Sequence, residues 1–165
     1  MEYDVTISEW GDSHPRWPEV IRFFGDHEDS YAELIPGYDQ RDSRILVATI
    51  GETLAGILRL IVIPIGPEDG LPAVQFHGGE VQQAKVMNFT VLPEFRRRGV
   101  GTRLQEAAIR MAKSLSCYQL ASFSDDGLTA NHMLKLRMGF AVHPVALGNA
   151  GRHGLHFIMP LAEPR

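Results

Sequence analysis

The hydrophobic pattern of the chain predicts seven strands and four helices. Seven short segments are rich in Val, Ile, Leu and Phe, or alternate between apolar and polar residues, as strands do. They cover residues 3–8, 44–50, 54–63, 82–91, 118–123, 140–147 and 155–161. Apolar residues recur at helical spacing in residues 17–24, 31–34, 100–116 and 128–138. The predicted order of elements is therefore β-α-α-β-β-β-α-β-α-β-β.

The segments between these elements predict how the strands pair. Gly51-Glu52-Thr53 joins two strands and has the glycine expected of a hairpin. The helix at 100–116 separates two strands in a β-α-β crossover, which makes those strands parallel neighbours. Residues 148–154 join the last two strands as an antiparallel pair, and Ser124-Asp125-Asp126-Gly127 is typical of a helix start with a capping acid. Pro64 to Gly79 is a long loop, either a flap beside a substrate or an idle surface insertion.

A basic glycine turn, Arg96-Arg97-Arg98-Gly99-Val100-Gly101, stands between a strand and a helix. The first N–H groups of a helix have no internal partner and carry partial positive charge, so this turn is suited to holding an anion. A side chain at Gly99 or Gly101 would keep the anion from the main-chain N–H groups, and glycine tolerates the φ that such a turn needs. The pattern favours a pyrophosphate, although an ordinary turn followed by solvated arginines would read the same way.

The turn resembles the acetyl-CoA signature of the GCN5-related N-acetyltransferase (GNAT) superfamily. Arg96-x-x-Gly99-x-Gly101 matches its Arg/Gln-x-x-Gly-x-Gly/Ala motif, whereas the Rossmann and P-loop patterns do not fit. Flanking residues also stand where that family has a β-branched residue, a proline, an aromatic residue and a leucine: Val91, Pro93, Phe95 and Leu104. The resemblance implies an α/β (α+β) fold with a mixed sheet of about seven strands, about four helices and a splayed parallel pair.

The same resemblance implies an acetyl-CoA-dependent N-acetyltransferase in which a primary amine, on a small molecule or a peptide, attacks the acetyl group directly. Main-chain groups of Phe89 and Val91 would face the pantetheine, and the N–H groups from Arg97 through Thr102 would surround the pyrophosphate. The expected cofactor-binding residues are Phe89, Thr90, Val91, Arg96, Arg97, Arg98, Gly99, Val100, Gly101, Thr102 and Asn131.

The expected catalytic groups are marked less clearly. Lys135-Leu136-Arg137-Met138-Gly139-Phe140 resembles the family's Tyr-x-Lys-x-Gly-Phe, with Lys135 in place of the tyrosine that protonates the CoA thiolate in many members. Lys135 could donate that proton if burial lowered its pKa; otherwise it is an exposed helix lysine. Tyr31 or Tyr38 could then reach across as the donor instead, and Ser124 or water could assist. Glu80 and Glu33 are the candidate bases for the acceptor amine, or else solvated surface acids. A non-catalytic acyl-CoA-binding sensor or subunit is the alternative function, because the tyrosine is missing.

Composition and charge set the remaining expectations. The 165 residues have the length of one domain, residues 1–165, and the net charge of −4 argues against nucleic acid as a partner. The chain starts with acidic residues and its longest apolar run is broken by Arg59 and Pro64, so we expect a cytoplasmic protein with no membrane partner. Dimerisation is common in the family, and the two closing strands are the expected contacts of a homodimer.

Cysteine and histidine add little chemistry. Cys117 is the single cysteine and stands in an apolar context, which favours a small buried hydrophobe over a nucleophile. His153 and His156, three residues apart on one strand, would point to opposite faces, and no Cys or His cluster accompanies them. We therefore expect no metal site.

Overall fold

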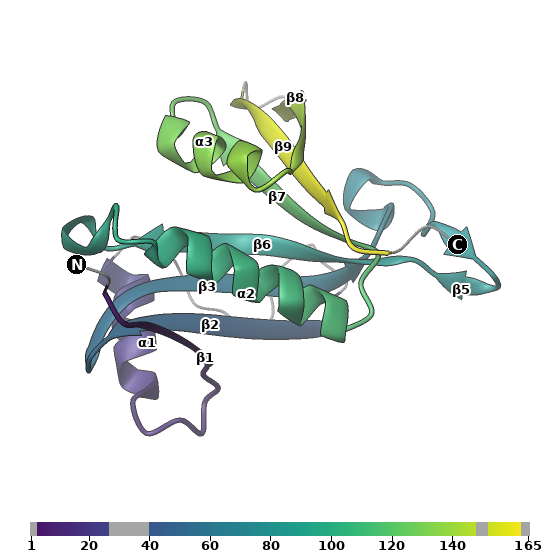
Figure 1. Ribbon diagram of the computed structural model, residues 1–165. Coiled ribbons are helices and arrows are strands. Elements are labelled where there is room, and N and C mark those ends of the chain that lie inside the picture. Colours follow the sequence, from purple (N-terminus) through teal and green to yellow (C-terminus); the bar gives the residue numbers. More distant parts are fainter. Residues whose placement is uncertain (1–2, 27–39, 148–151, 163–165) are drawn as a thin grey trace.

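A seven-stranded mixed sheet is the centre of the computed structural model, which describes residues 3–26, 40–147 and 152–162. The strands follow the order β1-β2-β3-β6-β7-β9-β8 (Figure 1). Their bounds are β1 Val5–Glu9, β2 Asp42–Ile50, β3 Thr53–Pro64, β6 Gln82–Val91, β7 Gln119–Asp125, β8 Ala141–Leu147 and β9 Arg152–Pro160. The α-helices of the described residues are α1 Trp17–Asp26, α2 Val100–Ser114 and α3 Thr129–Arg137.

The predicted strands and their pairing are confirmed, with corrections at the element ends. Ile50 pairs with Thr53, so the first hairpin turns on two residues rather than three. Ser124 and Asp125 belong to β7, and Leu128 at the N-cap of α3 makes no side-chain capping bond, so the predicted capping acid is wrong. The predicted helix at residues 31–34 lies outside the described residues.

The long loop before β6 contains structure of its own. It holds a short 3-10 helix, η1 (Pro67–Asp69), and a small hairpin formed by β4 (Gln75–Phe76) and β5 (Gly79–Glu80). A side-chain ion pair between Glu68 of η1 and Lys85 of β6 ties this loop to the central sheet. The predicted long loop is therefore partly structured, because backbone pairing between β4 and β5 and the contact of Glu68 with Lys85 order the segment.

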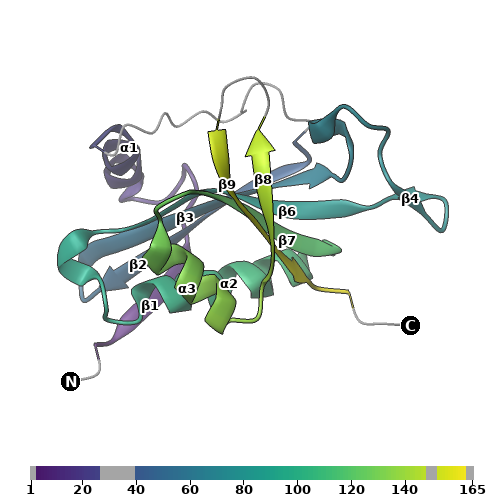
Figure 2. The same cartoon turned by 90° about the horizontal axis from the view of Figure 1, so that it is seen from above.

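Helices cover both faces of the sheet. Leu104 and Ala108 of α2 pack with Leu58 and Leu60 of β3 in one buried cluster. Phe24 and other apolar residues of α1 pack on the opposite face in a second cluster, and Figure 2 shows α1 and α2 on opposite sides of the strands. In the described part of the chain, no helix has both the length and the apolar character needed to cross a membrane. The two clusters hold β3 rigidly in the middle of the sheet.

Replacing Leu104 by alanine is expected to lower the free energy of unfolding by roughly 2–5 kcal/mol. The side chain is fully buried between α2 and β3, so its loss removes apolar contacts and leaves a cavity. Urea denaturation of the variant and of the wild type measures this difference. The exposed Leu128 of α3 is the control position, and a Leu128→Ala change should cost less than about 0.5 kcal/mol.

The parallel pair β6 and β7 separates part-way along its length. Their pairing runs from Gln83 with Gln119 to Val86 with Ser122. Beyond that point β6 continues beside β3 while β7 continues beside β9, and Figure 1 shows the two ribbons diverging. The register of β6 against β3 shifts between Arg59 and Leu60, which is the signature of a bulge where the divergence begins. This divergence is called the fork below.

Candidate active site

The glycine turn leads directly into α2 beside the fork. Arg97 and Gly99 both have left-handed φ values, 60° and 79°, which twist the backbone before the helix starts. The first backbone bond of α2 runs from the N–H of Arg103 to the carbonyl of Gly99, at 3.0 Å. Within the described residues, the N–H groups from Arg97 to Thr102 donate to no protein group. They form a run of main-chain donors at the positive end of a 15-residue helix.

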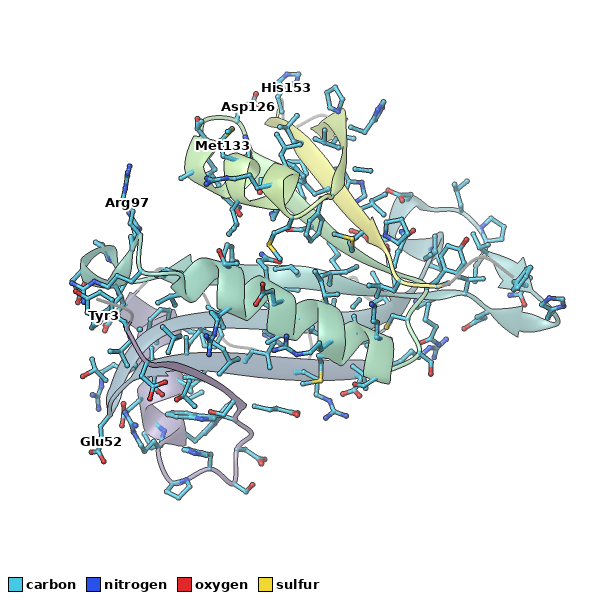
Figure 3. The ribbon with its side chains drawn as sticks, viewed as in Figure 1. Tyr3, Glu52, Arg97, Asp126, Met133 and His153 are labelled. Carbon is cyan, nitrogen blue, oxygen red and sulfur yellow. The ribbon has the colours of Figure 1, made fainter. Side chains whose placement is uncertain are left out.

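The three arginines of the turn have different surroundings. Arg96 donates from Nε to the carbonyl of Val91 at 3.1 Å, which fixes the turn to the end of β6. The guanidinium of Arg98 lies 4.3 Å from the centre of the Tyr3 ring, a cation-π contact that holds the N-terminal strand against the turn. Arg97 is exposed and extends away from the helix into solvent (Figure 3). Of the three, Arg97 is best placed to meet an anion outside the turn.

The two glycines of the turn are needed for different reasons. A Cβ at Gly99 would meet nothing within 4 Å, so its glycine serves the left-handed φ. A Cβ at Gly101 would lie 3.3 Å from Leu134 Cδ2 and 3.3 Å from Phe89 Cζ. Gly101 therefore lets α3 and β6 pack closely against the start of α2. Gly101 thus meets a packing requirement in addition to the access for an anion that the sequence predicts.

The unpaired edge of β6 beyond Val86 faces the fork. It contains Phe89, Thr90 and Val91, whose other neighbours are residues of β3. Because β7 no longer pairs with this edge, an extended ligand could bond to it as an additional strand would. The carbonyl of Val91 already accepts from Arg96, which leaves its N–H for such a ligand.

Lys135 is buried under α3, so the alternative of an exposed helix lysine is wrong. Its Nζ donates hydrogen bonds to Ser122 Oγ at 2.7 Å and to Ser124 Oγ at 3.1 Å. It also lies 5.0 Å from the centre of the Phe157 ring. Ser122 is the last residue of β7 that pairs with β6, so the lysine amino group lies beside the point where the fork opens.

Burial changes the acid-base properties of Lys135. It lowers the pKa of this lysine from 10.5 to about 8, since removal from water disfavours the charged form. The hydroxyl partners are neutral and offset this effect less than a carboxylate would. At neutral pH the amino group is still protonated, yet it loses its proton far more readily than an exposed lysine.

Two serines support this lysine. Ser124 was noted from the sequence, whereas Ser122 was missed. The sequence could have indicated Ser122, because residues two positions apart in a strand, such as Ser122 and Ser124, lie on the same face of a sheet. Asn131 of α3 donates from Nδ2 to Ser124 Oγ at 2.8 Å, and its buried Oδ1 accepts no hydrogen bond from the described residues. Asn131 thus lies in the lysine network, with one polar atom left over for a ligand.

The candidate bases lie elsewhere. Glu80 is exposed on β5 and forms an ion pair with Arg41 at 3.1 Å. It is six residues before Val86, which is about 20 Å of extended chain from the fork. The structure therefore does not bring Glu80 to Lys135. Glu33 and the alternative donors Tyr31 and Tyr38 lie outside the described residues. Burial raises the pKa of Cys117 to about 11, which agrees with the expected buried thiol.

Known structures share this arrangement of strands and helices. The chain resembles NAA60 of Arabidopsis thaliana, solved in complex with acetyl-CoA, with a TM-score of 0.70, 13% identity, and coverage of 94% of this chain and 99% of that one. It resembles the ribosomal-protein-S18-alanine N-acetyltransferase of Escherichia coli with a TM-score of 0.60, 16% identity, and coverage of 98% and 96%. Ard1 of Thermoplasma volcanium gives a TM-score of 0.63, 14% identity, and coverage of 96% and 99%. The fold is thus one that acetyltransferases use.

The sequence itself places the chain in a family. Residues 8–140 match the sequence model of the Acetyltransferase (GNAT) family, which is most of the chain. The protein belongs to the GNAT acetyltransferase family, and the resemblance carried by the glycine turn is confirmed. No curated protein sequence matches the chain significantly.

Proposed function

We propose that this protein is an acetyl-CoA-dependent N-acetyltransferase that acetylates a primary amine by direct attack in a ternary complex. The observation that carries the proposal is the run of main-chain donors from Arg97 to Thr102 beside the fork. Donors at a helix start suit a diphosphate, and the unpaired edge of β6 suits the amide groups of pantetheine. The acetyl-CoA complex of the similar Arabidopsis structure supports this assignment.

The proposed mechanism gives each part of the site one task. The amides of the glycine turn hold the diphosphate, and the edge of β6 from Phe89 to Val91 orients the pantetheine toward Lys135. Acetyl-CoA supplies an activated acetyl group as a thioester. Lys135 donates a proton to the sulfur as the C–S bond breaks, and its lowered pKa of about 8 suits an acid that works near neutral pH.

Peptides with a free α-amino group are the first acceptors to test. The E. coli relative acts on an alanine of a ribosomal protein, and another similar structure, the NatC complex, was solved with a peptide and CoA. An α-amino group has a pKa near 8, so a useful fraction is already neutral at pH 7. Small polyamines and amino acids complete the panel, because the described residues do not select among these acceptors.

Two measurements test the proposal. Acetyl-CoA at saturating concentration should raise the melting temperature of the protein, because a ligand that binds only the folded state stabilises it. Release of CoA thiol should then depend on an amine from the panel. Absence of a thermal shift would contradict the proposal. A thermal shift without thiol release from any amine would favour the alternative, a non-catalytic acyl-CoA-binding protein.

A further inference from the structure

Successive residues of β7 face opposite sides of the sheet. Ser122 and Ser124 point toward α3, where Lys135 contacts both hydroxyls. Phe123, between them, therefore faces the other side. Residues paired across neighbouring strands share a face, so His156 of β9, which pairs with Phe123, lies on this second side as well. The proton donor and His156 thus lie on opposite faces of the sheet at the fork.

His156 lies close to the wall of the fork. The backbone of His156 on β9 lies about 5 Å from that of its partner Phe123 on β7. The opposite edge of β7 at Phe123 is not paired with β6, because that pairing ends at Ser122. A Cβ at Gly154 would lie 2.6 Å from Phe123 Cζ, so the phenyl ring leans over Gly154. Two residues before Phe123 on the same face of β7 lies Ala121, which has a small side chain. Among the described residues, the small side chain of Ala121 lies between His156 and Lys85, and Lys85 stands one residue before the last paired residue of β6.

Charged or titratable groups from three elements, β6, β8 and η1, surround His156. Lys85 of β6 and His143 of β8 lower the pKa of His156, Asp69 of η1 raises it, and Glu68 of η1 contacts Lys85. Burial is the largest effect, and it also lowers the pKa from the usual 6.5. The imidazole is half-buried, makes no hydrogen bond within the described residues, and is neutral at pH 7.

We propose that His156 is the proton acceptor for the amine that enters the fork. This inference rests on the proposed function. An ammonium R–NH₃⁺ gives one proton to the imidazole, and the freed lone pair forms the N–C bond to the acetyl carbon. The C–S bond breaks, the sulfur takes a proton from Lys135, and the nitrogen loses its second proton, which restores Lys135. The products are the acetamide, CoA thiol and one proton, which leaves His156 to solvent.

The geometry also explains why two groups divide this work. The thioester carbon presents two faces, so an amine that attacks from one side meets a different set of residues from those beside the departing sulfur. Lys135 serves the α3 side through its contacts with Ser122 and Ser124. On the opposite side, burial lowers the pKa of Lys85 to about 8, but the carboxylate of Glu68 in contact with it favours the charged form, and a cation cannot accept a proton. Of the groups named on that side, His156 is the one that is neutral at pH 7, is partly buried and pairs with Phe123 at the fork.

His156→Gln tests the inference, with His153→Gln on the same strand as the matched control. The acceptor is the panel amine with the highest wild-type rate of thiol release. We expect His156→Gln to lower kcat/KM roughly 10²-fold or more and to remove the fall in rate on the acid side of the wild-type pH profile, because that fall follows protonation of the imidazole. The exposed His153 should tolerate its change with less than about a twofold effect. Acetyl-CoA should raise the melting temperature of all three proteins equally.

The outcomes separate the inference from the proposed function. An unchanged pH profile in His156→Gln, with an unchanged rate, would overturn the role of His156 and leave the acetyltransferase assignment intact. A lower rate with the same acid limb as the wild type would also overturn it, because a merely structural change would not move that limb. If acetyl-CoA did not raise the melting temperature of the wild type, the proposed function itself would be contradicted.

Discussion

Replacing Lys135 by methionine is expected to lower kcat roughly 10²- to 10⁴-fold while making the protein more stable at pH 7. Methionine has a similar length and fills the buried space under α3, but it carries no proton for the sulfur. The wild-type kcat should fall as the pH rises through about 8, because the acid must be protonated to act. The variant should lose that alkaline limb. Thiol release across pH 6–10 measures both effects.

The expected gain in stability follows from the sign of the pKa change. Lys135 has a pKa of about 8 in the folded protein and 10.5 as its ordinary value, so the unfolded chain binds more protons between these values. Wild-type stability should therefore rise with pH across this window, and at pH 7 the buried charge lowers it. Removing the charge should stabilise the fold by on the order of 2 kcal/mol, reduced by the hydrogen bonds lost at Ser122 and Ser124.

Two control variants sharpen the interpretation. Lys135→Arg keeps a positive charge that cannot be given up near neutral pH, so its kcat should stay low if proton donation is the role of the lysine. Lys113→Met changes an exposed lysine in the last turn of α2 and should alter neither kcat nor stability appreciably. A Lys135→Met enzyme with wild-type kcat would show that the thiolate leaves without this acid.

Replacing Gly101 by aspartate is expected to abolish the thermal shift given by acetyl-CoA. The new carboxylate would lie at the free N–H groups of α2 and repel a diphosphate there, a loss of roughly 10²-fold or more in affinity. Its Cβ would also meet Leu134 and Phe89 at 3.3 Å, so the start of α2 must shift slightly. Differential scanning fluorimetry with and without acetyl-CoA measures the effect, and isothermal titration gives the affinity.

Charge and bulk can be separated at this position. Gly101→Asn has nearly the same shape without the charge, so it should retain more of the affinity than Gly101→Asp. Gly11→Asp places the same side chain at an exposed turn where a Cβ meets nothing within 4 Å, and it should bind like the wild type. A full thermal shift in Gly101→Asp would contradict the assignment of the diphosphate to the amides of this turn.

Local patterns predicted the fold and the glycine turn that begins α2 well. The strand before the turn, the glycines and the apolar face of α2 depend on residues within a few positions of each other, which is why periodicity revealed them. Element ends were less certain: Ser124 and Asp125 belong to β7 because pairing with β9 extends that strand, and no local signal announces such pairing. The loop before β6 is ordered instead by a short local hairpin and by the contact of Glu68 with Lys85.

The catalytic side could not be predicted in this way. Glu80 precedes β6 closely in the sequence, but it lies at the end of β6 that is remote from the fork. The sequence showed Lys135 in the tyrosine's place without showing whether it was buried. Burial depends on how α3 packs on β7 and β9, and that packing sets both the serine contacts and the pKa.

By itself, the sequence determined the order of the elements, the glycine turn that opens α2 and the family to which the chain belongs. Only the tertiary structure decided that Lys135 is a buried donor held by two serines and that His156 shares a sheet face with Phe123. The physical reason is the range of the interactions: helix and strand periodicity are local, whereas solvent exclusion and strand register join residues far apart in the chain.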